Sequence, residues 1–315
     1  MAFPQEMLDL IADRVRFTGL SCGDEGWREQ KDALRETDLI LSTWGMPVLN
    51  TEFLRHAPNL RGVFYAAGSV KPFATPEAFL RGVHISSASM ANAIPVAEYA
   101  ASVILLSLKR FWRHARATRQ QHSWLRLPVS GAYQSVVGLV SLGAIGRMTV
   151  RMLQNHDLQV LAYDPFVSQE TALKLGVKLT SLEEVFRRSD VVSIHTPWLP
   201  ETENMINGEL LRMMKEGATI LNTSRGAVIN EADLCDVLQE RPDISAVLDV
   251  THPEPPAPDS PLYQLDNVVL TPHISGSMGN EITRMGRWMV EELVRFLNGD
   301  TLRYKISESH LTAAA

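Results

Sequence analysis

The 315-residue sequence has little cysteine, no excess of positive charge and no long uncharged apolar run. Its two cysteines, Cys22 and Cys235, are far apart and lack the spacing of metal ligands, which favours a reducing compartment over a disulfide framework. Thirty basic residues against thirty-six acidic ones give a net charge of −6. This balance argues against a nucleic-acid partner, because phosphate binding needs a basic excess or a basic stripe.

The longest uncharged apolar stretch in the middle of the chain, Tyr99 to Leu108, is far shorter than the roughly 20 residues that cross a bilayer. The N-terminus has neither the basic start nor the apolar segment of a secretory signal. The sequence therefore predicts a cytoplasmic protein without a membrane partner. Its length allows about two domains, and 45% hydrophobic residues with 21% charged residues is ordinary globular usage.

Short β-branched runs alternate with helical stretches along most of the chain. Segments 144–155 and 231–239 have apolar residues three and four positions apart, as amphipathic helices do. Strands alternating with helices of this length predict right-handed βαβ units and parallel sheets covered on both faces. The expected strands are 15–20, 38–43, 62–66, 84–88, 136–142, 159–164, 191–196, 218–223, 246–250 and 268–272.

Two long helices are expected to connect two domains. One starts near Asn92 and runs past Lys109, and the other covers 281–298. The composition of the first helix changes from apolar to basic and polar around Lys109, and a loop at 123–134 with Pro128 and Gly131 then leads to the next strand. We therefore place the domain boundary in this region, at the change of composition. The predicted domains are residues 1–108 together with 284–315, and residues 109–283.

The segment 136–147 reads as an apolar strand, a turn of small residues and an amphipathic helix. In dinucleotide-binding folds such a turn presents backbone N–H groups to the pyrophosphate, usually through the pattern G-x-G-x-x-G. Here Ser141 takes the first position, and Gly143 and Gly146 remain for close backbone approach and helix–strand packing. Asp164 ends the next strand, 18 residues after Gly146, where an acidic residue meets the ribose hydroxyls. A carboxylate there disfavours a 2′-phosphate, so NADH is expected to be preferred over NADPH.

Four residues whose side chains can bind an anion or transfer a proton follow the carboxyl ends of later candidate strands. They are Arg225, Asp249, Glu254 and His273, and this edge of an open α/β sheet is where ligands bind. A guanidinium can hold a 2-keto acid through paired hydrogen bonds. An imidazole can transfer a proton, and a neighbouring carboxylate fixes its tautomer and favours its protonated form.

In order and spacing these motifs resemble those of the D-isomer-specific 2-hydroxyacid dehydrogenases, of the phosphoglycerate dehydrogenase and glyoxylate/hydroxypyruvate reductase type. The resemblance covers nearly the whole chain. Besides the turn, it rests on Tyr163-Asp164-Pro165, His195-Thr196-Pro197, Asn222-Thr223-Ser224-Arg225-Gly226, Asp249-Val250, Pro253-Glu254-Pro255 and Pro272-His273.

The resemblance implies two doubly wound α/β domains, a Rossmann NAD-binding domain inserted into a flavodoxin-like substrate domain. It implies an NAD-dependent enzyme that moves a hydride between nicotinamide and a small D-2-hydroxy acid or 2-keto acid. It further implies a homodimer built around the helix and arm at 99–134. No metal is expected.

The resemblance also assigns catalytic roles. Arg225 is similar to the family's substrate-binding arginine, His273 to its general acid/base, and Glu254 to the carboxylate that hydrogen-bonds this histidine. Asp249 resembles the residue that holds the nicotinamide carboxamide. His195 is interpreted as structural or as a neighbour of the cofactor, and His252 as loop surface.

The remaining implied contacts concern cofactor and substrate. Backbone N–H groups of Ala144 and Ile145 would face the pyrophosphate, and Thr196 and Thr223 would contact the cofactor. The loop at 67–70, with Ser69 and Val70, is similar to the one that binds the substrate carboxylate, and Asn92 matches a position near that site.

Some features depart from the family pattern. Lys71 follows the carboxylate loop and is either solvated or able to reach a second anionic group. Trp198 replaces a smaller aliphatic residue, and Tyr65 and Trp44 add bulk near the expected cleft, which leaves the substrate's size open. The chain starts at a helix, 4–12, where relatives have a strand first, so either the sequence begins late or the sheet lacks a strand.

Two alternatives stay open. Formate- or phosphite-oxidising relatives share the arginine and the histidine, although Glu254 favours a keto-acid reductase. A non-catalytic NAD-sensing scaffold could keep the same fold and residues.

Overall fold

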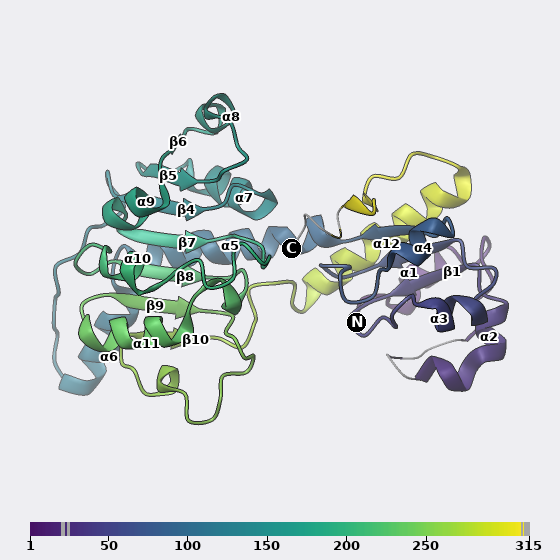
Figure 1. Ribbon diagram of the computed structural model, residues 1–315, viewed down its shortest axis with the longest axis horizontal. Helices are drawn as coiled ribbons and strands as arrows, with labels where there is room; N and C mark the ends of the chain where they lie inside the picture. Colours follow the sequence, from purple (N-terminus) through teal and green to yellow (C-terminus); the bar gives the residue numbers. More distant parts are fainter. Residues whose placement is uncertain (20–22, 24–25, 310, 312–315) are drawn as a thin grey trace. The chain divides into compact units, whose positions relative to one another are not determined.

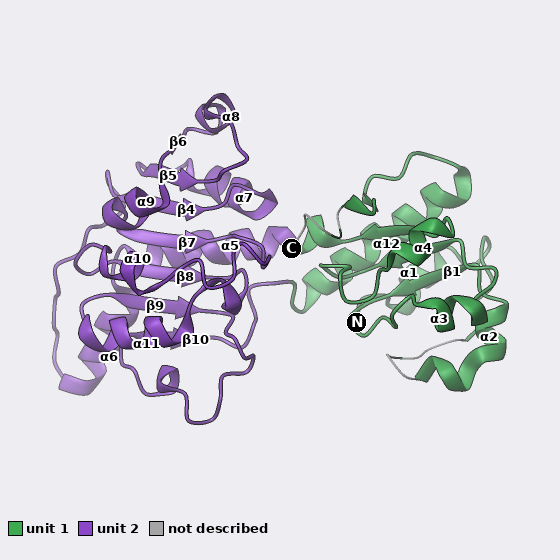
Figure 2. Ribbon diagram, viewed as in Figure 1, with its two compact units in different colours: residues 1–92, 277–315 green, residues 93–276 purple. Residues whose placement is uncertain are grey.

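The computed structural model describes residues 1–19, 23, 26–309 and 311 (Figure 1). Cys22 and Leu20 lie outside the described residues. The chain forms two compact units, residues 1–92 with 277–315 (unit 1) and residues 93–276 (unit 2), coloured separately in Figure 2. The predicted boundaries at 108/109 and 283/284 lie further along the chain than these divisions.

Unit 2 contains a seven-stranded sheet in the order β10-β9-β8-β7-β4-β5-β6, with every ladder parallel. The first strand of the unit lies inside the sheet, and later strands are added toward both edges, as in dinucleotide-binding folds. Its elements are β4 Val136–Val140, α7 Ala144–Leu153, β5 Gln159–Tyr163, α8 Gln169–Lys174, β6 Val177–Leu179, α9 Leu182–Arg188, β7 Val191–Ile194, α10 Gly208–Arg212, β8 Thr219–Asn222, α11 Glu231–Glu240, β9 Ser245–Leu248 and β10 Val268–Leu270.

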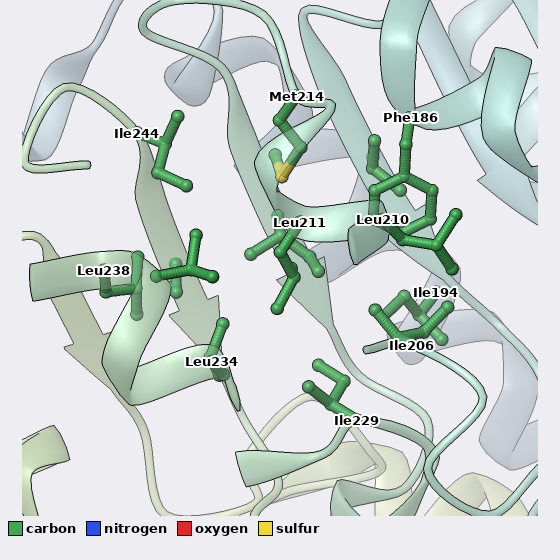
Figure 3. Close-up of a cluster of buried hydrophobic side chains, with 14 of the residues drawn as sticks. Phe186, Ile194, Ile206, Leu210, Leu211, Met214, Ile229, Leu234, Leu238 and Ile244 are labelled. Atoms are coloured by element: carbon green, nitrogen blue, oxygen red, sulfur yellow. The ribbon is translucent and has the colours of Figure 1, made fainter. Parts of the chain in front are cut away.

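Both faces of this sheet are buried. Alternate side chains of β7 show it, since Val192 and Ile194 join one apolar cluster and Val191 joins another. Helices α9, α10 and α11 supply much of the first cluster, shown in Figure 3. Burial on both faces explains why the strands read as continuous apolar runs.

Unit 1 has a four-stranded sheet in the order β1-β2-β3-β11 among the described residues. The first three strands are parallel, but β11 pairs antiparallel with β3, so this sheet is mixed at one edge. β1 pairs directly with β2, and no further strand lies between them. Its elements are α1 Gln5–Asp9, α2 Lys31–Arg35, β1 Leu39–Ser42, α3 Thr51–His56, β2 Gly62–Tyr65, α4 Pro76–Leu80, β3 His84–Ser87, α12 Asn280–Asn298 and β11 Lys305–Ile306.

The expected helix from 92 past 109 is two helices, α5 Ser89–Ser107 and α6 Phe111–Gln121. Arg110 between them has φ 47°, a left-handed conformation that ends the first helix. Most of α5 belongs to unit 2, because Val103, Ile104 and Leu108 pack with the strands of that unit. This packing is why the unit division falls near the start of α5 rather than at its end.

By length and composition alone, α5 is long and apolar enough to cross a membrane, which the sequence prediction from Tyr99 to Leu108 missed. The helix runs through Glu98, and half of the apolar stretch is buried inside the structure. Its contacts with the sheet of unit 2 account for its apolar composition.

The strand prediction was wrong at 15–20, since residues 15–19 form no strand. Arg16 is instead paired with Glu36 at the surface, and Gly19 has φ 74°. The edge strand β6 was missed because it has only three residues and includes a lysine. The α/β class with two doubly wound parts is confirmed.

Candidate active site

The turn between β4 and α7 holds the residues expected to face a pyrophosphate. Gly143 is the N-cap of α7, and no side chain caps this helix end, so its first N–H groups are available to a ligand. A Cβ at Gly143 would meet only the Ser141 hydroxyl, at 3.9 Å, whereas a Cβ at Gly146 would overlap the Ser141 carbonyl oxygen. Gly146 is therefore required by the packing of the turn, and Gly143 is not.

Ser141 adopts φ 82°, a conformation that favours glycine. Its N–H donates to the Tyr163 carbonyl at 2.8 Å, which attaches the turn to the end of β5. Asp164 completes this attachment, since its Oδ2 accepts from the Leu142 N–H at 2.8 Å and its Oδ1 accepts from the Phe166 N–H at 2.9 Å. The expected ribose carboxylate thus lies beside the expected pyrophosphate turn.

Two buried polar atoms near this edge, the Thr223 Oγ1 and the His195 Nδ1, have no hydrogen-bond partner among the described residues. Unpartnered buried polar atoms are costly, and a bound ligand is one way to satisfy them. Together with the uncapped α7 terminus, they fit a dinucleotide cofactor. The hydroxyl of Thr196, also expected at the cofactor, donates to the Val140 carbonyl.

His195 is buried, and burial lowers its pKa to about 4. The imidazole is therefore neutral at physiological pH, with its Nε2 3.0 Å from the Ser193 hydroxyl. A histidine held neutral in this way is not a proton donor at pH 7, in keeping with its interpretation as structural or as a neighbour of the cofactor.

Arg225 follows β8 on a tight turn. A Cβ at Gly226 would overlap the backbone of Thr251, so only glycine lets these two loops approach. The Arg225 Nη1 donates to the Ser224 carbonyl at 2.6 Å. Burial lowers the pKa of the guanidinium, and the nearby negative charge of Glu254 acts in the opposite direction.

The side chains of His273 and Glu254 form a hydrogen bond across two loops, with 2.6 Å between Nδ1 and Oε1. Both side chains are more than two-fifths exposed, so the Nε2 of the ring can reach a ligand. His273 has φ 53°, and such left-handed non-glycine residues cluster at functional sites. The expected acid/base pair is thus assembled on unit 2 next to Arg225.

Asp249 is buried and fixes the loop that carries His273. Its Oδ1 accepts from the Thr271 hydroxyl at 2.5 Å and from the Ile274 N–H at 2.9 Å, and its Oδ2 accepts from the Ser275 N–H at 2.8 Å. The Tyr99 hydroxyl lies 3.1 Å from that of Thr271 and extends the network. Sequence reasoning did not find this positioning role, because the donors come from a separate loop.

Trp198 contacts His252, with ring centroids 5.1 Å apart and the rings edge-on. The Trp198 Nε1 donates to the Glu203 carboxylate at 3.1 Å. His252 is exposed in its loop, as expected, and its ring also joins the loop after β7 to the loop that carries Glu254. Their contact could not be found from the sequence, in which they are 54 residues apart.

The expected carboxylate loop lies in unit 1. None of the N–H groups of Gly68, Ser69 and Val70 donates a hydrogen bond within the described residues, so all three are available to a carboxylate. The Ser87 hydroxyl donates to the Gly68 carbonyl at 2.6 Å and fixes the loop. Asn92 accepts from the Ser277 N–H at 2.8 Å through its Oδ1.

Two further features of the described residues bear on the site. Tyr65 is buried in the core of unit 1, 4.7 Å from Phe73 between ring centroids, so it adds no bulk to a cleft. No group of three or more histidine, cysteine or acidic side chains could hold a metal ion within the described part of the chain.

The chain matches known proteins over nearly its full length. Residues 102–275 match the family model of the D-isomer specific 2-hydroxyacid dehydrogenase, NAD binding domain. A D-3-phosphoglycerate dehydrogenase of Archaeoglobus fulgidus is 31% identical over 94% of this chain and 56% of its own length. A glyoxylate reductase of Korarchaeum cryptofilum is 31% identical over 86% of this chain and 82% of its own length. The D-mandelate dehydrogenase of Rhodotorula graminis has a TM-score of 0.78 and 26% identity, covering 95% and 94% of the two chains.

The chain belongs to the D-isomer-specific 2-hydroxyacid dehydrogenase family, and residues 102–275 are its NAD-binding domain. The expected resemblance is confirmed. The chain spans about half the length of the curated phosphoglycerate dehydrogenases it matches first.

Proposed function

We propose that this protein is an NAD-dependent oxidoreductase that interconverts a small D-2-hydroxy acid and the corresponding 2-keto acid. The observation that carries the proposal is the His273–Glu254 pair beside Arg225 on the NAD-binding unit. Family membership supports the same reaction, because its named relatives include D-3-phosphoglycerate dehydrogenase and glyoxylate reductase.

In this proposal each residue has one task. Arg225 holds the keto acid through its guanidinium and polarises the carbonyl. His273 donates the proton to the forming alkoxide during reduction, and Glu254 orients the ring through Nδ1. The N–H groups of Ser69 and Val70 bind the carboxylate, with Asn92 nearby. The nicotinamide of bound NAD supplies or accepts the hydride.

The proposed cofactor contacts follow the same edge of unit 2. The N–H groups of Ala144 and Ile145 bind the pyrophosphate, and Gly143 permits its approach. Thr196 and Thr223 contact the cofactor, and Asp249 holds the carboxamide. Asp164 accepts hydrogen bonds from the ribose hydroxyls, and its negative charge repels a 2′-phosphate. NADH is therefore preferred over NADPH. A cytoplasmic homodimer built around residues 99–134 is part of the proposal.

The test is NADH and NADPH consumption against glyoxylate, hydroxypyruvate, pyruvate, phenylpyruvate and oxaloacetate. Turnover of at least one acid with NADH preferred is the expected result. No turnover, with NADH binding retained by calorimetry, would favour oxidation of formate or phosphite if either reduces NAD, and a sensing scaffold if neither does.

Two variants test the roles. His273→Ala should abolish turnover and leave NADH binding intact, and a fully active variant would remove His273 from the mechanism. Glu254→Gln should lower kcat for the reduction, because the His273 Nδ1 loses the carboxylate that orients the ring. An unchanged kcat would contradict the pairing.

A further inference from the structure

Tyr99 carries a hydroxyl group from α5 to the loop that holds His273. The helix belongs to unit 2 from residue 93 onward, and the Tyr99 ring packs against the buried cluster that includes Ile104 and Leu139. Because a packed ring is rigid, the position of its hydroxyl is well defined. This hydroxyl lies 3.1 Å from that of Thr271, which is 172 residues further along the chain. The mechanism proposed above uses neither of these two side chains.

The direction of the hydrogen bonds between these side chains follows from their chemistry. Thr271 donates its hydroxyl proton to the Asp249 Oδ1 at 2.5 Å. A hydroxyl has one proton to donate, so the Thr271 oxygen accepts from Tyr99. Burial raises the pKa of Tyr99, and the negative charge of Asp249 acts in the same direction, so the phenol keeps the proton that it donates. Two hydrogen bonds in sequence therefore connect α5 with the Asp249 carboxylate.

Asp249 holds the backbone on both sides of His273. Its carboxylate accepts from the Thr271 hydroxyl, two positions before the histidine, and from the N–H groups of Ile274 and Ser275 after it. Its carbonyl accepts from the His273 N–H at 3.0 Å. His273 has φ 53°, and such a conformation persists only where the surrounding structure over-determines it. The place of the His273 ring therefore depends on these hydrogen bonds.

We propose, on the basis of the proposed function, that Tyr99 is a positioning residue for the reduction of the keto acid. Its hydroxyl acts through Thr271 on Asp249 and so keeps the His273 loop in the conformation that transfers the proton. Without the phenol hydroxyl, the buried Thr271 oxygen loses its donor and the loop gains freedom close to His273. A loop with more freedom spends less time in the reactive geometry, so the loss falls on kcat.

The experiment measures kcat, KM for the keto acid and the NADH dissociation constant in Tyr99→Phe, which keeps the packed ring and removes only the hydroxyl. We expect kcat to fall about tenfold. KM and the NADH dissociation constant should stay within about twofold of the parent values, because the lost contact acts on the transition state. Tyr304→Phe is the matched control and should keep the parent's kcat, since Tyr304 is also partly buried but lies in unit 1, stacked on Trp288.

A double-mutant cycle tests whether Tyr99 acts through Thr271. Thr271→Val removes the hydroxyl and keeps the branched shape, and it should lower kcat at least as much as Tyr99→Phe, because Asp249 also loses a donor. In the Thr271→Val background, Tyr99→Phe should have no further effect on kcat, since residues that act as a unit are not additive. Thr271→Ser keeps the hydroxyl and should retain the parent's kcat.

The failures of the two proposals are distinguishable. A parent-like kcat in Tyr99→Phe, a loss confined to KM or NADH binding, or an undiminished loss in the Thr271→Val background overturns the positioning role and leaves the proposed function standing. Absence of turnover by the parent with every keto acid, while NADH binds, overturns both. An unfolding temperature equal to that of the parent shows that a variant is folded. If Tyr99→Phe does not fold, equal kcat in Thr271→Val and Thr271→Ser overturns the positioning role.

Discussion

The two glycines of the cofactor turn are expected to respond differently to the same substitution. An added methyl at Gly146 overlaps the Ser141 carbonyl oxygen and lies 3.3 Å from the carbonyl carbon. At Gly143 the nearest atom is 3.9 Å away, which is ordinary van der Waals contact. Gly146→Ala therefore tests packing, and Gly143→Ala tests the approach of a ligand.

The magnitude for Gly146→Ala follows from two opposing effects. The Ser141 backbone cannot easily move, because its N–H is bonded to the end of β5. Overpacking of this kind costs about 1–3 kcal/mol, and the better helix propensity of alanine offsets about 1 kcal/mol. Because the overlapped atom belongs to the backbone, the cost lies in the upper part of this range, about 2–3 kcal/mol. We therefore expect a net loss of about 1–2 kcal/mol in the free energy of unfolding.

Gly143→Ala should leave stability almost unchanged. Alanine is a poorer N-cap than glycine, and this loss of about 0.5–1 kcal/mol is offset by about 0.4–1 kcal/mol from the restricted unfolded chain. Its methyl group would stand at the N-terminus of α7, where the proposed function places the pyrophosphate. We expect the NADH dissociation constant to rise at least tenfold, or about 1.4 kcal/mol.

The assay is urea unfolding at pH 7 together with titration calorimetry of NADH. Gly23→Ala is the control, because an added Cβ there meets nothing within 4 Å and lies in the other unit. If Gly143→Ala binds NADH as the parent does, or Gly146→Ala is as stable as the parent, the division of tasks between the two glycines is refuted.

Two further predictions concern buried and aromatic groups of unit 2. Since burial lowers the pKa of His195 to about 4, against 6.5 in the unfolded chain, the unfolded state binds more protons between these values, and stability falls as the pH falls. Between pH 7 and pH 5, the free energy of unfolding in urea should fall by about 2 kcal/mol more in the parent than in His195→Gln. His156→Gln, at an exposed histidine, is the control and should follow the parent. If stability falls equally with pH in His195→Gln and in the parent, the burial argument is contradicted. Trp198→Ala should lower kcat for keto-acid reduction several-fold, because an edge-on aromatic pair worth about 0.5–1.5 kcal/mol holds the His252 loop. Trp198→Phe should recover most of the loss, and equal kcat in the alanine variant and the parent would show that the contact does not position the loop.

Much of unit 2 could be predicted from the sequence. Its central strands are buried on both faces, so each one reads as an apolar run, and all six expected between 136 and 272 are present. The strand β6 lies at a sheet edge, is three residues long and leaves too little pattern to detect. The break between α5 and α6 depends on the backbone of Arg110 and is not marked by proline or glycine.

The α/β class and the candidate cofactor turn could be predicted from the sequence alone, as could the residue types that the proposed mechanism uses, because these depend on local periodicity and on motif spacing. Which loops meet is seen only in the folded chain. The 2.6 Å contact of Glu254 with His273, the three hydrogen bonds to Asp249 and the Trp198–His252 pair join residues from different strand ends. Such contacts depend on strand order and register, which arise when the sheet assembles and cannot be seen in any single segment.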